Sequence, residues 1–340
     1  MGIQANFFKF HENIKLGYES ESYSSAKVKD LSITKAVKEA FKAKGYSVID
    51  NFIQGSFSTH TAVQSLDGDF DIDRAIVIDF EDAPENPVDT KKVVLGVLEK
   101  RGFTNATIKK PCVTADYAAE DLHIDFPIYS KQGDSYFLAV GKLNSDENNR
   151  EWSSSDPKGL KDWVNDKSMF YGSAGDELQQ FKRIVRYLKR WRDVKFSEAV
   201  AKKVYSIGLT VMAKESFLPC LDDDGNPNDL KAMKDTVNQM TSRGYFSYEK
   251  DEKYRVRVLL PTSPWRDIFD GSALDTGTQF INKLNNLDNK LLDALTETDE
   301  IKQCKILNNL FGEDFIIPEL IKTQKAKFSS AGTVGTSQGA

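Results

Sequence analysis

The first 145 residues alternate between helical and strand-like patterns of apolar side chains. Residues 23–46 carry apolar residues at near-helical spacing and end at Gly45, a common helix stop. Residues 90–103 show the helical pattern again. Short strand-like runs lie between and after these helices, so this part of the chain is predicted to mix strands and helices. The apolar positions of the first helix are Leu31, Ile33, Val37 and Phe41.

Two segments alternate as half-buried strands do. Residues 70–80, FDIDRAIVIDF, alternate at first and then become continuously apolar. Residues 121–130, DLHIDFPIYS, alternate cleanly between apolar and polar side chains. Side chains two residues apart on a strand point to the same face. Each segment is therefore expected to bury one face and to present carboxylates on the other.

From about residue 155 the pattern becomes helical. Residues 154–166 open with a Ser/Asp cap and Pro157 in the first turn, which favours a helix start. The stretch 176–193 places six apolar residues on one stripe: Leu178, Phe181, Ile184, Val185, Leu188 and Trp191. We expect an α+β fold in two lobes. Residues 1–150 would form a sheet-based core lobe, residues 151–325 a helical lobe that closes a cleft, and residues 326–340 a flexible tail.

Composition narrows the class of protein. A chain of 340 residues with 40% hydrophobic residues can bury a large core. The net charge of -5 argues against a protein that coats nucleic acid, although a local basic pocket for a small anion is compatible with it. Three dispersed cysteines and three histidines indicate neither a disulfide framework nor a Cys/His metal cluster. No leader-like segment or long apolar run occurs, so we expect a cytoplasmic protein without a membrane partner.

The aspartates of the 70–80 strand indicate a metal site. Asp71 and Asp73 would share a face with Ile72 packed behind them, and like charges side by side are unfavourable unless a cation offsets them. Hard carboxylate oxygens suit Mg²⁺, with Mn²⁺ as the alternative ion. Asp125 would add a third ligand from the second strand, and such a set can activate an attacking hydroxyl and stabilise a leaving pyrophosphate. Asp69 leaves the pairing open, because Asp69/Asp71 has the same spacing as Asp71/Asp73.

A Gly-Ser pair precedes these carboxylates. Gly55 would let the backbone approach a phosphate, and the Ser56 hydroxyl would help to cradle it. Phosphoryl transfer needs positioning and charge neutralisation more than a covalent nucleophile. Aspartates on a surface strand and a lone Gly-Ser are each common. The order Gly-Ser, Asp-x-Asp and a later strand aspartate is specific, and it resembles the polymerase-β-like nucleotidyltransferase superfamily.

Within that superfamily the chain resembles the bacterial cGAS/DncV-like nucleotidyltransferases (CD-NTases) of CBASS anti-phage systems, in the branch that contains the Vibrio cyclic GMP-AMP synthase. The shared blocks run in family order: QGSFSTHT, DFDID, HIDFPIY, SSDPKGLKDWVND, RYLKRWRD and YSIGL. The resemblance implies a polymerase-β-like fold and a Mg²⁺-dependent enzyme. It also implies a cyclic di- or trinucleotide second messenger, made from ATP, GTP or other ribonucleoside triphosphates and read by a downstream effector.

The resemblance also assigns nucleotide-binding residues. Gln54, Gly55 and Ser56 would hold the donor triphosphate, and Lys189 and Ser206 would reach the phosphates from the helical lobe. Lys189 lies off the apolar stripe of a basic helix, where the alternative is a solvated helix face. For Ser206 the alternative is a hydroxyl tolerated inside a buried helix.

Other functions stay open at this point. A linear nucleotide-adding enzyme, either oligoadenylate synthase-like or RNA-tailing, would use the same carboxylates, and an inactive nucleotide-binding module would need none. No stable nucleic-acid partner is expected. Residues 329–340 have little to bury, and an E1/E2-like ligase of the kind found in related operons would conjugate the chain through Ala340. The sequence selects neither the bases, the linkage nor the ring size.

Overall fold

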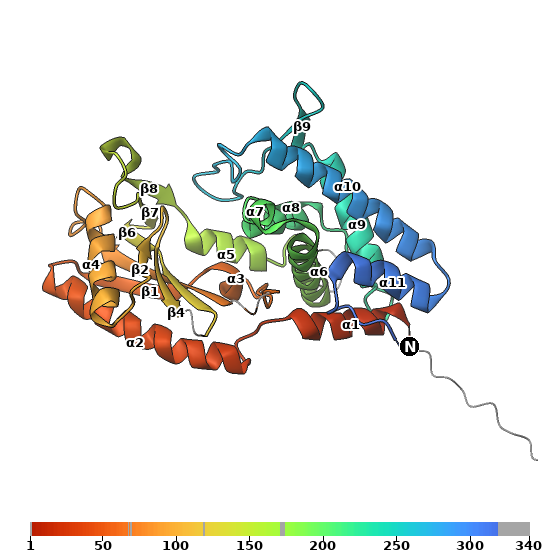
Figure 1. Cartoon of the computed structure of the whole chain (residues 1–340), viewed down its shortest axis with the longest axis horizontal. Helices are drawn as coiled ribbons and strands as arrows, with labels where there is room; N and C mark the ends of the chain where they lie inside the picture. Colours follow the sequence, from red (N-terminus) through yellow and green to blue (C-terminus); the bar gives the residue numbers. More distant parts are fainter. Residues whose placement is uncertain (1, 67, 69, 118–119, 171–173, 319–340) are drawn as a thin grey trace, which may run out of the picture.

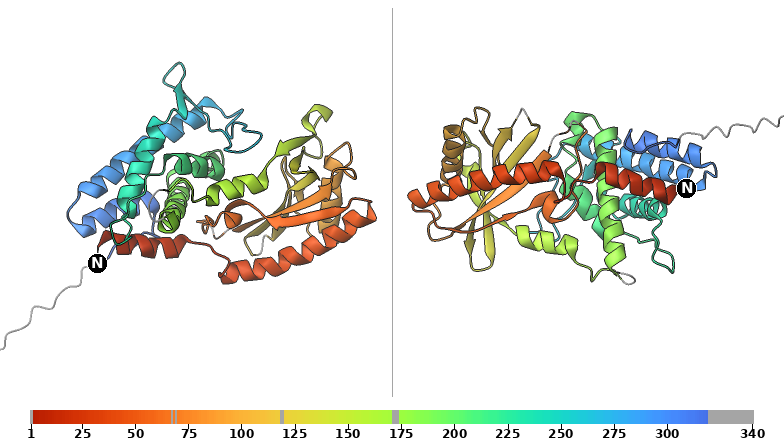
Figure 2. Two further views of the ribbon diagram at one scale, coloured as in Figure 1. Left: turned by 180° about the vertical axis from the view of Figure 1, so that it is seen from behind. Right: turned by 90° about the horizontal axis from the view of Figure 1, so that it is seen from below.

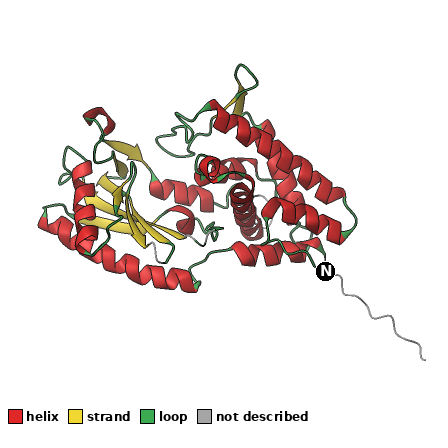
Figure 3. Ribbon diagram, in the orientation of Figure 1, coloured by secondary structure: helices red, strands yellow, loops and turns green. Residues whose placement is uncertain are grey.

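The computed structural model describes residues 2–66, 68, 70–117, 120–170 and 174–318. The chain forms a lobe built on a β-sheet and a lobe built on helices, side by side (Figure 1). The expected α+β class is confirmed, and the distribution of helix and strand along the chain is clear in Figure 3. In the described residues no helix is both long and apolar enough to cross a membrane.

The sheet of the first lobe is organised around one long central strand. Its strands are β1 (Val48–Ile53), β2 (Phe70–Asp79), β3 (Thr107–Ile108), β4 (Val113–Tyr117), β5 (Leu122–Phe126), β6 (Ile128–Gln132), β7 (Ser135–Val140) and β8 (Glu151–Ser155). The order is β3-β4-β5-β2-β6-β7-β8, and β1 also pairs with β2. The first part of β2 runs parallel to β5, and its second part lies between β1 and β6.

Two helices cover one face of this sheet, as Figure 1 shows. They are α2 (Glu21–Ala43) and α4 (Val88–Lys100), close to the two helices that the sequence pattern predicts. Ile72, Ile76 and Ile78 of β2 pack into the core beneath them. Ala75 and Val77 belong to a second cluster on the opposite face. Since side chains alternate along a strand, the carboxylates at positions 71 and 73 lie on the face turned away from α2 and α4.

The second lobe is a helical bundle with a small hairpin. Its elements after the sheet are α5 (Pro157–Asn165), α6 (Ala174–Lys195), α7 (Glu198–Ala201), α8 (Ser206–Ser216), α9 (Asp229–Ser242), β9 (Phe246–Tyr248), β10 (Tyr254–Val256), α10 (Leu274–Thr296) and α11 (Glu300–Phe311). Asp156 caps α5 by accepting a hydrogen bond from the backbone of Gly159, and Pro157 follows it as expected. The short hairpin of β9 and β10 is an addition to a lobe that the sequence pattern predicts to be almost entirely helical.

The first helix, α1 (Ile3–Ile14), belongs to the helical lobe rather than to the sheet lobe. Phe7, Phe10 and Ile14 are spaced as one helical face and are fully buried in the helical core. Figure 2 shows α1 lying beside α6 and α11, before the chain crosses to α2. The sheet in turn extends to Ser155, so the chain passes from the sheet lobe to the helical lobe after residue 155 and not at residue 150.

The central helix α6 is buried on its polar side as well as on its apolar stripe. The six apolar residues of the predicted stripe are all buried. Lys182, Arg186, Lys189 and Arg190 are buried too, and the last three donate hydrogen bonds to the loop that lies across them. The alternative of a solvated face for Lys189 is therefore wrong.

Candidate active site

The three candidate metal-binding aspartates lie on adjacent strands. Parallel pairing of β2 with β5 sets Asp73 opposite Asp125 and Asp71 opposite His123. Because Asp71 and Asp73 are two residues apart, all three carboxylates share one face of the sheet. Asp71 is exposed, whereas Asp73 and Asp125 are half-buried. The structure thus brings together the set that the alternating patterns predict.

Neighbours of these carboxylates set their electrostatics. Burial first, and then the charges of Asp125 and Asp71, raise the pKa of the Asp73 carboxyl to about 7. The Thr114 hydroxyl donates a hydrogen bond to Asp125 Oδ1, and Lys109 Nζ lies 3.5 Å from the same oxygen. Burial and the two neighbouring carboxylates together outweigh the positive charges of Lys109 and Lys189 in raising this pKa, and a bound cation would oppose the shift.

The donor chemistry fits a hard divalent cation. Three carboxylates on one face are the oxygen ligands that Mg²⁺ or Mn²⁺ prefers, and the β2–β5 register sets them on neighbouring strands. Among the described residues, no group of three or more His, Cys, Asp or Glu side chains is already gathered tightly enough to hold a metal ion. The three aspartates fit a metal ion because they are carboxylates on one face of the sheet, although their side chains are not yet arranged around a common point.

Gly55 opens the short helix α3 (Gly55–Ser58) directly against Asp73. Its φ of 65° is in the left-handed region, and a Cβ built on it would lie 2.0 Å from Asp73 Oδ2. Only glycine therefore fits here without moving the aspartate. The turn is also fixed from behind, since the Gln54 backbone N–H donates to Asp73 O at 3.0 Å and the Tyr129 hydroxyl donates to Gln54 Oε1 at 3.0 Å.

The helical lobe contributes Lys189 and Ser206. Lys189 Nζ donates to Thr61 O at 2.8 Å and to Thr61 Oγ1 at 3.1 Å. Burial, followed by the charges of Arg192 and Arg186, lowers the pKa of Lys189 to about 7. Ser206 is the first residue of α8 rather than an interior one, and its Oγ accepts a hydrogen bond from Arg192 Nη1 at 2.7 Å.

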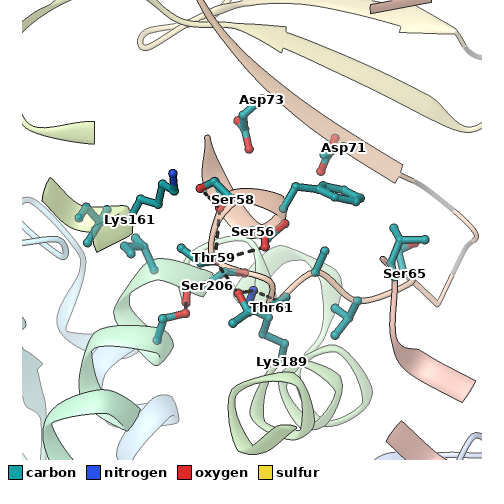
Figure 4. Close-up of a pocket in the computed structure, with 18 of the residues that line it drawn as sticks. Ser56, Ser58, Thr59, Thr61, Ser65, Asp71, Asp73, Lys161, Lys189 and Ser206 are labelled. Carbon is teal, nitrogen blue, oxygen red and sulfur yellow. Dashed lines mark hydrogen bonds between the residues drawn. The ribbon is translucent and has the colours of Figure 1, made fainter. Parts of the chain in front are cut away.

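A cavity of about 360 Å³ lies between these groups. Figure 4 shows Asp71 and Asp73 on one side, α3 and the loop after it in the middle, and Lys189 and Ser206 on the opposite side. Six of the eight predicted catalytic and nucleotide-binding residues line it: Gly55, Ser56, Asp71, Asp73, Lys189 and Ser206. Gln54 and Asp125 do not line it and lie behind the turn and on the neighbouring strand. Asp69 and Ala340 are outside the described residues.

Sequence reasoning missed several groups of this cavity. Lys161 of α5 and Arg192 of α6 both line it, and Arg192 also pairs with Asp193 at 2.7 Å. Lys161 and Arg192 lie inside two of the sequence blocks noted above, so a signal was present. The sequence pattern does not show that these two side chains point into the cavity, because their orientation depends on how the two lobes pack together.

Comparison with known proteins agrees with this geometry. Residues 50–129 match the family model of the Cyclic GMP-AMP synthase DncV-like nucleotidyltransferase domain. This segment contains the Gly-Ser turn and all three aspartates.

Two cyclic GMP-AMP synthases are relatives by sequence. The one from Escherichia albertii is 29% identical over 63% of this chain and 47% of its own length. The one from Vibrio cholerae is 22% identical over 65% of this chain and 46% of its own length. The chain thus spans about half the length of the curated relatives it matches.

The fold as a whole matches a solved relative. The structure of a Vibrio cholerae di-nucleotide cyclase (DncV) mutant in complex with ATP, GTP and 5MTHFGLU2 superimposes with a TM-score of 0.68 at 17% identity, covering 90% of this chain and 93% of that one. The likeness in fold extends over both lobes, and the family match covers the turn and the carboxylates. Residues 50–129 therefore match the DncV-like nucleotidyltransferase domain family, and the chain as a whole has a fold similar to that of the solved di-nucleotide cyclase.

Proposed function

We propose that the chain is a Mg²⁺-dependent nucleotidyltransferase that joins ribonucleoside triphosphates into a cyclic dinucleotide. The observation that carries this proposal is the β2–β5 register, which sets Asp71, Asp73 and Asp125 on one sheet face beside a cavity with a cationic far wall. The names of the sequence relatives, and the ATP and GTP bound in the solved relative, support these two nucleotides as substrates. A cyclic trinucleotide is the second product class that the same chemistry allows.

The residues in the cavity and beside it have different roles in binding. Asp71, Asp73 and Asp125 would hold Mg²⁺, which supplies charge neutralisation for the triphosphate and the departing pyrophosphate. Gly55 and Ser56 bind phosphate oxygens through the backbone and the serine hydroxyl at the exposed start of α3. Lys189 presents its ammonium group from the opposite wall.

The reaction is a displacement at the α-phosphorus. A ribose hydroxyl of one nucleotide loses its proton to the Asp125 carboxylate. The oxygen forms a bond to the α-phosphorus of the second nucleotide as the bond from that phosphorus to pyrophosphate breaks. A second displacement within the same cavity closes the ring. We further propose that this product signals to an effector in anti-phage defence.

Thin-layer analysis of reactions with radiolabelled ATP, GTP, CTP and UTP tests the proposal. A cyclic product has no terminal phosphate, so it should survive phosphatase treatment, and it should be absent when Mg²⁺ is removed. The double variant Asp71→Asn/Asp73→Asn is the control. Phosphatase-sensitive products would indicate a linear nucleotide-adding enzyme instead. Nucleotide binding without any product would indicate an inactive module.

A further inference from the structure

A row of polar side chains continues from the aspartates toward the edge of the sheet. The strand register pairs Asp73 with Asp125, Asp125 with Thr114, and Thr114 with Thr107. Residues that are directly opposite on neighbouring strands project from the same face. The row therefore runs from two carboxylates on β2 and β5 to two hydroxyls on β4 and β3. The proposed reaction gives no role to its hydroxyl end.

Thr114 is the member of this row that touches a proposed metal ligand. Its hydroxyl donates a hydrogen bond to Asp125 Oδ1, and only 3% of the residue is exposed. A β-branched side chain is stiff about χ1, and Thr114 sits within a paired strand. The donor is therefore held in place by the backbone register rather than by a flexible side chain.

Lys109 approaches the same carboxylate oxygen from the turn between β3 and β4. Its Nζ lies 3.5 Å from Asp125 Oδ1, and 51% of its side chain is exposed. The turn itself is anchored from below by the buried Lys91 of α4, whose Nζ donates to Lys109 O at 3.1 Å and to Lys110 O at 2.6 Å. The backbone of Lys109 is thus fixed, while its ammonium group lies at the solvent edge of the site.

The two contacts differ in charge. Both are made to Oδ1, and the buried Cys112 thiol also hydrogen-bonds to the Asp125 side chain. A neutral hydroxyl orients the carboxylate without opposing a second cation, whereas an ammonium group repels one. The Lys109 ammonium group lies 3.5 Å from a carboxylate oxygen of Asp125, where it partly neutralises the negative charge of that side chain. Lys109 therefore offsets part of the charge that a metal ion would neutralise.

We propose that Thr114 and Lys109 act on Asp125 with opposite effects on metal binding. Thr114 is a positioning residue that fixes Oδ1 and so directs Oδ2 toward the metal ion and the attacking hydroxyl. Lys109 is a built-in counter-cation, whose charge stabilises the carboxylates before a metal ion binds and weakens the binding of that ion. The inference rests on the proposed function in one respect, that Asp125 is a metal ligand.

Titration of the nucleotide-free chain with Mn²⁺, followed by electron paramagnetic resonance, tests both roles without turnover. Loss of a hydrogen-bond partner of a ligating carboxylate typically costs about 10–100-fold in metal affinity or activity. We expect Thr114→Val to raise the Kd for Mn²⁺ about tenfold, and Thr114→Ser, which keeps the hydroxyl, to stay within about twofold of the wild type. Thr107→Val is the matched control, because Thr107 lies in the same row but is exposed on the edge strand.

Lys109→Met should change the same Kd in the other direction. Removing a positive charge beside a metal ligand should lower the Kd for Mn²⁺ at least about twofold at low ionic strength, and the difference should shrink as salt is added. Lys110→Met is its control, since Lys110 is an exposed lysine on the same turn. An unchanged or raised Kd in Lys109→Met would overturn the counter-cation role.

Steady-state kinetics separate positioning from packing. At saturating Mn²⁺, Thr114→Val should lower kcat about tenfold while the KM for ATP stays within about twofold, because the carboxylate is misdirected rather than the nucleotide lost. Thr114→Ala serves as the second variant should valine disturb the strand, with the melting temperature of each variant as the check. A Thr114→Ser variant as impaired as Thr114→Val would show that the methyl group rather than the hydroxyl matters, and would overturn the positioning role.

The outcomes distinguish this inference from the proposed function. If the wild type binds no Mn²⁺, the metal assignment of the proposed function fails and this inference fails with it. If the wild type binds Mn²⁺ and Thr114→Val has the Kd and kcat of the wild type, the positioning role alone is wrong.

Discussion

Replacement of Gly55 by alanine tests whether the turn before α3 positions the Asp73 carboxylate. The new Cβ would stand 2.0 Å from Asp73 Oδ2, whereas real Cβ contacts essentially never fall below 3.0 Å. The carboxylate must therefore retreat by about 1 Å or the turn must shift. A misplacement of about 1 Å at a reacting centre can cost about 10²-fold in rate. We expect a loss of that size in the rate of nucleotide joining.

Backbone strain also enters, and a second glycine separates it from the contact. Gly55 has a φ of 65°, and forcing an L-residue into the left-handed region costs about 1–2 kcal/mol. Gly45, at the end of α2, has a φ of 82°, and an added Cβ there would have nothing within 4 Å. Gly45→Ala should lose about the same 1–2 kcal/mol of stability and keep full activity.

The assay compares the two variants side by side. Thermal and denaturant unfolding give the stability of each, and the rate of pyrophosphate release at saturating ATP, GTP and Mg²⁺ gives the activity. If Gly55→Ala retains the activity of Gly45→Ala, the contact with Asp73 does not position the carboxylate, and the argument from the turn is wrong.

Four further predictions concern the same cavity and the tail. Asp71→Asn/Asp73→Asn should lower turnover about 10³-fold or more without loss of melting temperature, because the like charges are removed; wild-type turnover would contradict the metal assignment. Lys189→Ala should weaken binding of a non-hydrolysable triphosphate about tenfold, and it should also lower the melting temperature because the hydrogen bonds to Thr61 are lost. An unchanged binding isotherm would show that Lys189 stabilises the fold and does not bind the nucleotide. The pKa of Lys189 is lowered from 10.5 to about 7, so between these pH values the unfolded chain binds more protons than the folded chain. The stability of the unliganded protein should therefore rise with pH through this window. The affinity for triphosphate should fall over the same window as the lysine loses its charge, and Lys189→Met should flatten both trends. Deleting residues 326–340 should leave synthesis by the purified chain intact but abolish conjugation through Ala340 by a co-expressed E1/E2-like ligase, as read by mass spectrometry; a deletion that stops synthesis would count against a separate tail function.

The carboxylate site was accessible from the sequence because strand periodicity fixes the direction of a side chain. The alternation around Ile72 and Ile124 buried those residues and left Asp71, Asp73 and Asp125 on the opposite face. The requirement for glycine at position 55 was also visible as a pattern, although its cause, the contact with Asp73, is a tertiary one.

The polar side of α6 shows where the sequence was insufficient. Arg186, Lys189 and Arg190 have the composition of a solvated face, yet they donate to backbone carbonyls of residues 60–64. Carbonyl groups are present at every residue and leave no signature in the sequence. The burial of these cations, and the cavity beside them, therefore depend on a packing arrangement that periodicity alone cannot predict.

The placement of α1 has a consequence for how the protein is made. Asn6 Nδ2 bonds to Cys304 Sγ at 3.4 Å, across 298 residues, and the rings of Phe7 and Phe10 pack against Phe311 and Phe315. At a synthesis rate of about 5–20 residues per second, these C-terminal partners of α1 leave the ribosome about 15–60 s after it does, later than its other partner Tyr187 of α6. The sheet lobe can meanwhile assemble from residues 17–155. The helical lobe is completed later, when α11 has been made and packs against α1. Until α11 is made, the part of this aromatic helix face that faces Phe311 and Phe315 stays uncovered on the nascent chain.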